Sequence, residues 1–336
     1  MVGHDPGPGR PVCVVAGRDD ATADPVILAL HARDMPVVRL DLADFPRTVR
    51  LDAAFTGRGW IGTLAVGDHA VHLEKIRAVW WWHPVLCRVN GGLSAAEARW
   101  TVAESTAGLA GVLASLDCLQ VNDPVDAYAT RSRARMLTLA AGCGLRVPDT
   151  WIGNDPKAAR DFAAASHPGV VCKALTRSAV HHPDGRRTVL RPRPVDPDDL
   201  DDSVTLSAHL LQRAVPTACN VRVVVVGDRA FAVRIDSSAP SAQWDARAEH
   251  GSLRYRAIDL PEQISRGVAR LMDRSRLLYA TLDFVVDTAN GCWWLVSVNP
   301  AGRYDRIEAA LPELGISHAL ADLLTHSSLP VTWRAA

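Results

Sequence analysis

The clearest pattern of hydrophobic and polar positions lies within residues 280–308. Val285-Val286 and residues 293–298 are short β-branched and aromatic runs, and the Asp-Thr-Ala-Asn-Gly stretch between them carries the Asn-Gly signal of a turn. The pattern therefore predicts a β-hairpin. In that hairpin Asp283 and Asn299 fall near the same end of the ladder, where side chains on paired strands lie roughly 5 Å apart.

These two side chains offer oxygen atoms that suit a hard cation. Mg²⁺ binds carboxylate and amide oxygens and is usually completed by water and phosphate, so the pair points towards a nucleoside triphosphate. The alternative is that Asp283 only caps a strand end and that Asn299-Pro300 only begins a turn.

Strand and helix patterns alternate along the rest of the chain, which is typical of an α/β protein. Residues 11–40 predict a β-α-β unit, and Ser94 with Glu97 forms a capping box at the start of a long core helix over 95–116. The other predicted elements are hairpins at 60–73 and 221–236, strands at 146–152 and 169–175, and helices at 125–142, 261–271 and 316–324.

Composition argues against a nucleic-acid-binding, membrane-binding, disulfide-stabilised or zinc-binding protein. Thirty-seven basic and thirty-seven acidic residues balance, which gives no electrostatic reason to expect nucleic acid or a membrane surface as a partner. Seven scattered cysteines without a Cys-x-x-Cys spacing suggest neither a disulfide framework nor a zinc site. No secretory segment or membrane span is recognisable, so we expect a cytoplasmic protein.

Cationic residues in predicted strands are candidates for binding phosphate. Lys173 is one of three lysines and lies in an apolar strand, where a phosphate would be a good partner; the alternative is that it extends to solvent. Arg222 and Arg234 lie at the outer ends of the 221–236 hairpin, where they could clamp a triphosphate or an acyl phosphate. P-loop and Rossmann glycine patterns are absent from the sequence.

Three consecutive tryptophans, Trp80, Trp81 and Trp82, end a predicted strand of the first unit. Because a strand alternates faces, we expect one of them to point away from the others and to mark an interface or a ligand wall. Arg18-Asp19-Asp20 lies at a loop where parallel sheets bind ligands, although a solvated turn is the plainer interpretation. His181-His182 is interpreted as a pair of exposed loop histidines.

Leu282-Asp283-Phe284, the hairpin, Val298 to Gly302 and Ile307-Glu308 together resemble the C-terminal metal-binding segment of ATP-grasp ligases. The nearest resemblance is to the maturases of graspetides (microviridin-type peptides), which join acidic side chains of a ribosomal precursor peptide to its hydroxyl or amine side chains. It extends over residues 12–324. Departures from that family's pattern are Arg133 and Thr217 for Lys, Asn220 for an acid, Ser297 for Glu and Arg303 for Gln.

The resemblance implies an α/β ATP-grasp fold with an N-terminal pre-ATP-grasp domain. It implies a disordered tail (1–10), a pre-ATP-grasp domain (11–122), a central domain (123–205), a C-terminal domain (206–326) and a second tail (327–336). It also implies ATP and Mg²⁺ as cofactors. The implied roles are nucleotide contact by Arg133, Lys173, Gln212, Val215 and Arg222; catalysis by Lys173, Arg222 and Arg234; a metal pocket of Asp283, Ser297 and Asn299; and substrate contact by Asp245, Arg247 and Trp82.

The implied activity is an ATP-dependent carboxylate ligase that activates Asp or Glu side chains of a precursor peptide, with its leader and acidic core, for ester or amide macrocycles. Two alternatives stay open. One is an ATP-grasp amide ligase acting on another amino acid or protein. The other is a peptide-binding pseudoenzyme, which the loss of the carboxylate at Ser297 favours. The oligomeric state, with a homodimer as one option, is not predicted.

Overall fold

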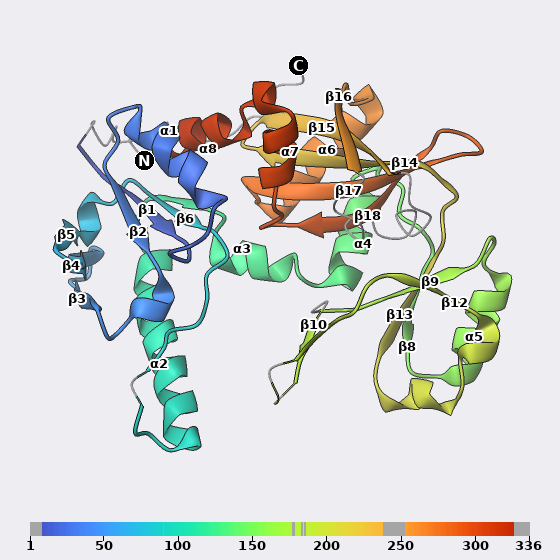
Figure 1. Ribbon diagram of the computed structural model, residues 1–336, viewed down its shortest axis with the longest axis horizontal. Helices are drawn as coiled ribbons and strands as arrows, with labels where there is room; N and C mark the ends of the chain where they lie inside the picture. The colour runs from blue at the N-terminus through green and yellow to red at the C-terminus, as the bar shows by residue number, and fades with distance from the viewer. Residues whose placement is uncertain are drawn as a thin grey trace.

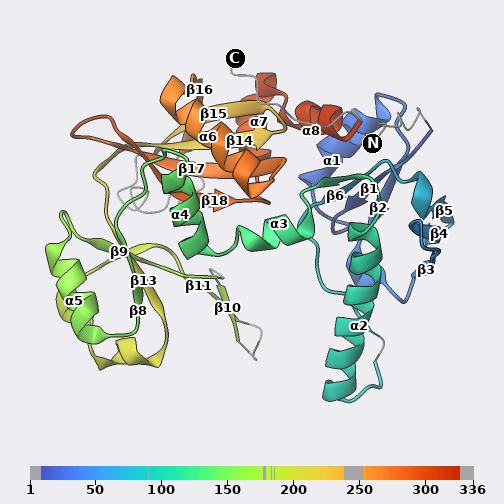
Figure 2. The same cartoon turned by 180° about the vertical axis from the view of Figure 1, so that it is seen from behind.

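The computed structural model describes residues 9–89, 91–176, 179–182, 184, 186–237 and 253–325. Its elements form three α/β units, which Figures 1 and 2 show from opposite sides. None of the helices in these ranges is long and apolar enough to cross a membrane.

The N-terminal unit is built on a parallel sheet in the order β2-β1-β6-β7. The predicted β-α-β unit is present in it, and the capping box at Ser94 begins helix α2. A second, antiparallel sheet, β3-β4-β5, extends the predicted hairpin by one strand. The bounds are β1 Val12–Val15, α1 Ala23–His31, β2 Val37–Leu40, β3 Val49–Phe55, β4 Trp60–Val66, β5 His69–His72, β6 Ala78–Trp81, α2 Ala95–Ala114 and β7 Leu119–Val121.

The predicted helix over 125–142 is two helices, α3 (Pro124–Ala129) and α4 (Arg133–Gly142). Ser132 separates them, because its hydroxyl accepts a hydrogen bond from the N–H of Arg135 and so caps a new helix. Met136 and Ala140 of α4 pack into the core of the C-terminal unit, where α4 lies against α6 (Glu262–Ser275) (Figure 2).

The central unit carries an antiparallel sheet in the order β12-β9-β13-β8 with α5 packed on it. β13 is central in this sheet, so the unit's sheet continues past the expected boundary at residue 205. β10 and β11 pair as antiparallel strands, so His181, expected in a loop, ends strand β10. The bounds are β8 Thr150–Gly153, α5 Pro156–Ala165, β9 Val170–Lys173, β10 Ala179–His181, β11 Arg187–Val189, β12 Arg193–Val195 and β13 His209–Arg213.

The C-terminal unit is a five-stranded antiparallel sheet in the order β16-β15-β14-β17-β18. It contains both predicted hairpins, and in the second one Asp283 lies opposite Ser297 while Thr281 lies opposite Asn299. The bounds are β14 Thr217–Val226, β15 Arg229–Ser237, β16 Leu253–Ile258, β17 Tyr279–Asp287, β18 Trp293–Asn299, α7 Asp305–Ala310 and α8 Ile316–Thr325.

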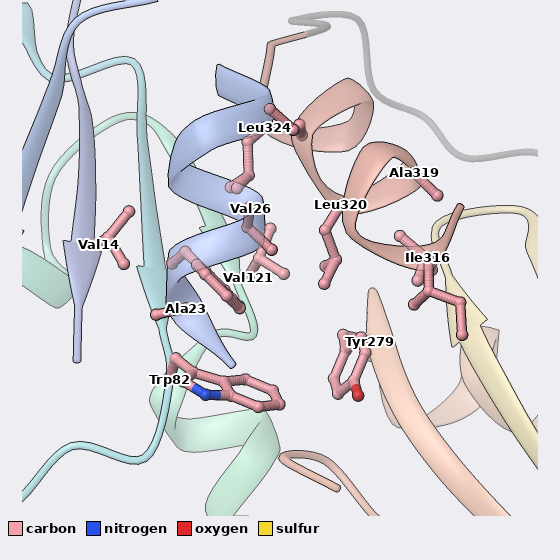
Figure 3. Close-up of a cluster of buried hydrophobic side chains, with 14 of the residues drawn as sticks. Val14, Ala23, Val26, Trp82, Val121, Tyr279, Ile316, Ala319, Leu320 and Leu324 are labelled. Carbon is pink, nitrogen blue, oxygen red and sulfur yellow. The ribbon is translucent and has the colours of Figure 1, made fainter. Parts of the chain in front are cut away.

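One hydrophobic core joins the N-terminal and C-terminal units (Figure 3). In it the Trp82 ring meets the rings of Tyr279 and Tyr304, with centroids 5.6 and 6.0 Å away. Trp80 belongs to the same core, whereas Trp81 packs into the core on the other face of the sheet, against α2. Trp81 thus points away from the other two, as the alternation of strand faces predicts, but none of the three is left partly outside: each is at most 8% exposed, because both faces of this sheet are covered.

Candidate functional site

A cavity of about 520 Å³ lies between the central sheet and the five-stranded C-terminal sheet. Both sheets and the segment after β18 contribute side chains to it. Predicted residues that line it are Arg133, Lys173, Gln212, Val215, Arg222, Asp283 and Ser297. Its other polar and aromatic lining residues include Arg213, Thr217, Asn220, Tyr255, Arg303, Tyr304, Asp305 and Arg306.

Lys173 and Gln212 form the polar pair on the central sheet. Lys173 Nζ donates a hydrogen bond of 2.6 Å to Gln212 Oε1, and Gln212 Nε2 donates one of 2.9 Å to Thr150 Oγ1. The strands β9 and β13 are direct neighbours, which places both side chains on the cavity face. Gln212 is 4% exposed, so its amide holds the ammonium group at a fixed place in the wall.

Arg222 and Asp283 form the polar pair on the C-terminal sheet, where they are register partners on β14 and β17. Arg222 Nε donates to Asp283 Oδ1 at 2.7 Å, and Nη2 donates to Oδ2 at 3.2 Å. The charge of Asp283 is the main cause that raises the pKa of Arg222 above its ordinary value. The guanidinium therefore stays charged, and this bidentate pair presents both signs of charge to the cavity.

Ser297 is the cross-strand neighbour of Asp283 and lines the cavity beside it. Asn299 lies two residues further along β18, at the strand end, and its Oδ1 accepts a hydrogen bond of 3.0 Å from the N–H of Ala301. Asn299 is exposed and does not line the cavity. The register thus brings Ser297 next to Asp283, and it gives Asn299 the turn-forming contact that was the alternative interpretation of the sequence.

The donor set fits a nucleotide polyanion more fully than it fits a metal ion. No group of three or more His, Cys, Asp or Glu side chains in the described ranges is placed to hold a metal. Mg²⁺ requires about six oxygen ligands, and Asp283 with the Ser297 hydroxyl supplies a small part of them. These residues therefore suit Mg²⁺ when phosphate and water provide the other oxygens.

Other predicted site residues are not brought to the cavity. Arg234 is the register partner of Val221, one residue from Arg222, so it projects from the opposite face of the sheet, where it pairs with Asp236 at 2.8 Å. The expected clamp of Arg222 and Arg234 on one triphosphate is wrong for this reason. Trp82 is buried in the interdomain core and cannot contact a substrate directly. Asp245 and Arg247 lie outside the described residues.

Sequence reasoning missed the contribution of the segment after β18. Arg303, noticed only as a departure from a family pattern, lines the cavity and bonds Asp20 and Thr22 of the N-terminal unit. Its carbonyl also accepts a hydrogen bond of 3.3 Å from Arg222 Nη1. No local pattern signals these contacts, because the partners lie more than 80 and more than 280 positions away.

Comparisons with known proteins agree with this architecture. The family model of the MvdD pre-ATP grasp domain matches residues 12–129. The macrocyclase MdnC of Microcystis aeruginosa, solved with its precursor peptide MdnA, has a TM-score of 0.82 and 25% identity, covering 93% of this chain and 98% of that chain. No curated protein sequence matches the chain.

Two further solved structures have the same fold. A RiPP-associated ATP-grasp ligase of Chryseobacterium gregarium, solved with ADP and a leader and core peptide, has a TM-score of 0.85 and 24% identity, covering 94% of this chain and 96% of that chain. The ATP-grasp ligase PsnB, solved with a minimal precursor, has a TM-score of 0.73 and 20% identity, covering 94% of this chain and 98% of that chain.

The chain therefore has the ATP-grasp fold with a pre-ATP-grasp domain at its N-terminus. The resemblance to the ATP-grasp maturases of ribosomal peptides, predicted from the residues around Asp283 and Asn299, is confirmed by these neighbours.

Proposed function

We propose that this protein is an ATP-dependent carboxylate ligase that activates Asp or Glu side chains of a ribosomal precursor peptide for ester or amide macrocycle formation. The observation that carries the proposal is the cavity between two sheets, with the Lys173–Gln212 pair on one wall and the Arg222–Asp283 pair on the other. Neighbours of this fold include structures solved with precursor peptide and with ADP.

The walls of the cavity suit the parts of a nucleotide. Val171, Val215 and Leu253 provide apolar surface for a base, and Lys173 and Arg222 provide positive charge for phosphates. Mg²⁺ bound beside Asp283 would supply further charge neutralisation at the phosphates.

In the proposed reaction a peptide carboxylate oxygen attacks the terminal phosphoryl group of ATP and displaces ADP. A hydroxyl or amine of the same peptide then attacks the acyl carbon, loses its proton and displaces phosphate. Lys173 and Arg222 lower the barrier by positioning the phosphates and by matching the charge of the transferring group. Because this reaction consumes ATP, we propose that the protein acts in the cytoplasm.

A second candidate is a peptide-binding protein that keeps the cavity but does not turn ATP over. Two observations favour it: a hydroxyl at Ser297 in place of a carboxylate, and Asp283 held in a bidentate pair by Arg222. Both candidates predict ATP binding, and they differ in whether ADP forms.

ADP release with and without an acidic peptide separates the two candidates. We expect the wild type to release ADP faster when a peptide containing Asp or Glu is added, and a peptide with Asn and Gln at the same positions to have no effect. Asp283→Asn should abolish the increase, while Asp161→Asn, which changes an exposed carboxylate of the central unit, should leave it intact. ATP binding without ADP release would support the second candidate and refute the first.

A further inference from the structure

Arg303, which lines the cavity, forms two hydrogen bonds with the N-terminal unit. Arg303 Nη2 donates to Asp20 Oδ2 at 2.9 Å, and Arg303 Nη1 donates to Thr22 Oγ1 at 2.8 Å. Asp20 and Thr22 belong to the loop between β1 and α1, whereas Arg303 follows β18 in the C-terminal unit. The planar guanidinium is thus held at two points by a different unit of the protein.

The loop is shaped to receive this arginine. Asp20 has a side chain that is 9% exposed, and its other oxygen, Oδ1, accepts hydrogen bonds from the N–H of Thr22 at 3.0 Å and from Trp82 Nε1 at 3.2 Å. Burying a carboxylate is costly unless a positive charge and hydrogen bonds compensate it, and Arg303 supplies the charge. Three hydrogen-bond donors therefore fix the orientation of the Asp20 carboxylate.

Thr22 gives an independent sign of the same role. It occupies the N-cap position of α1, where a threonine hydroxyl commonly accepts a hydrogen bond from the first turn of its helix, but its side chain makes no such bond. Thr22 as a whole is 1% exposed, and its hydroxyl accepts a hydrogen bond from Arg303 instead.

The backbone of Arg303 connects this anchor to the cavity. Its carbonyl oxygen accepts a hydrogen bond of 3.3 Å from Nη1 of Arg222, whose Nε and Nη2 hold Asp283. The Arg222 guanidinium is therefore fixed from two sides, by Asp283 within its own sheet and by the carbonyl of residue 303. Any shift of the Arg303 side chain that moves its backbone changes one of these two supports.

We propose that Arg303 is a positioning residue, which uses Asp20 and Thr22 of the N-terminal unit to hold the Arg222 guanidinium in the orientation that receives the phosphates of ATP. This inference rests on the proposed function, because it takes the cavity to be a nucleotide site. It adds that the pre-ATP-grasp domain, through Asp20 and Thr22, increases the affinity of the cavity for the phosphates of ATP. Arg303 acts through Arg222 and is not a catalytic residue itself.

The test compares calorimetric affinities for ATP and for AMP, which lacks the outer phosphates. We expect Asp20→Asn to weaken ATP binding on the order of tenfold and to leave AMP binding unchanged, because the charged hydrogen bond that anchors Arg303, and through it Arg222, is lost. Thr22→Val, which keeps the shape and removes the hydroxyl, should weaken ATP binding in the same direction by a smaller factor.

Arg33→Gln is the matched control, because it removes another ion pair between the same two units. Arg33 Nη2 lies 2.6 Å from Asp322 Oδ1, between the turn after α1 and helix α8, and neither residue lines the cavity. We expect this variant to change neither affinity. A mere loosening of the domain contact would weaken ATP binding in Arg33→Gln and Asp20→Asn alike and would overturn the inference.

A double-mutant cycle with Arg222→Lys gives the decisive measurement. Once the guanidinium is gone, its support has nothing to position, so Asp20→Asn should change ATP affinity by less than about twofold in that background. Additive losses would overturn the inference while leaving the nucleotide site in place. Failure of the wild type to bind ATP would overturn the proposed function together with it. If Asp20→Asn does not fold, Thr22→Val completes the same cycle with the same two outcomes.

Discussion

Lys173→Ala is the substitution whose effect on nucleotide binding the structure predicts most fully. The side chain lies in the cavity wall, and its ammonium group is held by Gln212 at 2.6 Å. A hydrogen bond to a charged group contributes about 1.5–3 kcal/mol, so losing the phosphate contact should raise the Kd for ATP roughly tenfold to a hundredfold.

The effect on thermal protection follows by mass action. At an ATP concentration one hundred times the wild-type Kd, ATP stabilises the folded wild type by about 2.7 kcal/mol. With Kd raised tenfold to a hundredfold, the same concentration stabilises the variant by about 1.4 to about 0.4 kcal/mol. The increase in Tm caused by ATP should therefore fall to about half of its wild-type size or less.

Differential scanning fluorimetry with and without ATP provides this measurement. The substitution also leaves Gln212 Oε1 without its charged partner, which lowers stability by about 1–3 kcal/mol in the absence of ATP, so the ATP-induced shifts are compared and not the absolute Tm values. Lys157→Ala is the control, because Lys157 is exposed and forms its ion pair with Asp161 on the surface of α5. An equal ATP-induced shift in wild type and Lys173→Ala would refute the placement of the nucleotide.

Three other expectations concern residues at the cavity and in the cores. Burial, with the nearby charge of Arg303, lowers the pKa of His83, so the free energy of unfolding should fall as pH decreases below about 6.5. His83→Asn should weaken that fall, measured by urea titrations at several pH values. Equal pH dependence in the wild type and the variant would contradict this expectation. Ser297→Glu should raise Mg²⁺-dependent ADP release about tenfold while Ser297→Gln should not, and equal rates in the two variants would show that charge beside Asp283 is not what limits the reaction. Burial raises the pKa of Cys13 and of Cys118 to about 12, so at pH 8 about 1 in 10⁴ of each thiol is ionised. Mass spectrometry should therefore find both cysteines unalkylated after the folded protein is treated with iodoacetamide. Rapid labelling of either cysteine would contradict this expectation.

Local patterns were sufficient for the parts of the site that lie within one hairpin or one strand. The Asn-Gly turn predicted the pairing of β17 with β18, whereas a β-bulge beside Asp283, which the turn does not predict, places Ser297 and not Val296 opposite Asp283. Lys173 stood out because it interrupts an apolar strand, and the structure places it in the cavity wall. Such features depend on residue type and on spacing over a few positions, both of which the sequence displays directly.

Contacts between distant strands could not be predicted in this way. Arg222 binds Asp283 because β14 pairs with β17, although β15, β16 and α6 separate them along the chain. Arg222 and Arg234 lie at the outer ends of one hairpin, which suggests a shared phosphate, but the alternation of strand faces puts Arg234 on the other side of the sheet. The burial of Trp82, which the sequence assigned to substrate contact, could not be predicted, because no local pattern shows that the C-terminal unit covers that face.

The central claim is that this cavity uses ATP to join side chains of an acidic precursor peptide. The most direct test is mass spectrometry of any short Thr- and Asp/Glu-rich peptide that a neighbouring open reading frame encodes, incubated with the protein, ATP and Mg²⁺. We predict the loss of one water for each bond formed. This loss should depend on ATP, and it should be absent with Asp283→Asn and absent when the peptide's Asp and Glu are replaced by Asn and Gln. A peptide of unchanged mass, under conditions in which ATP is bound and the peptide is bound, would contradict it.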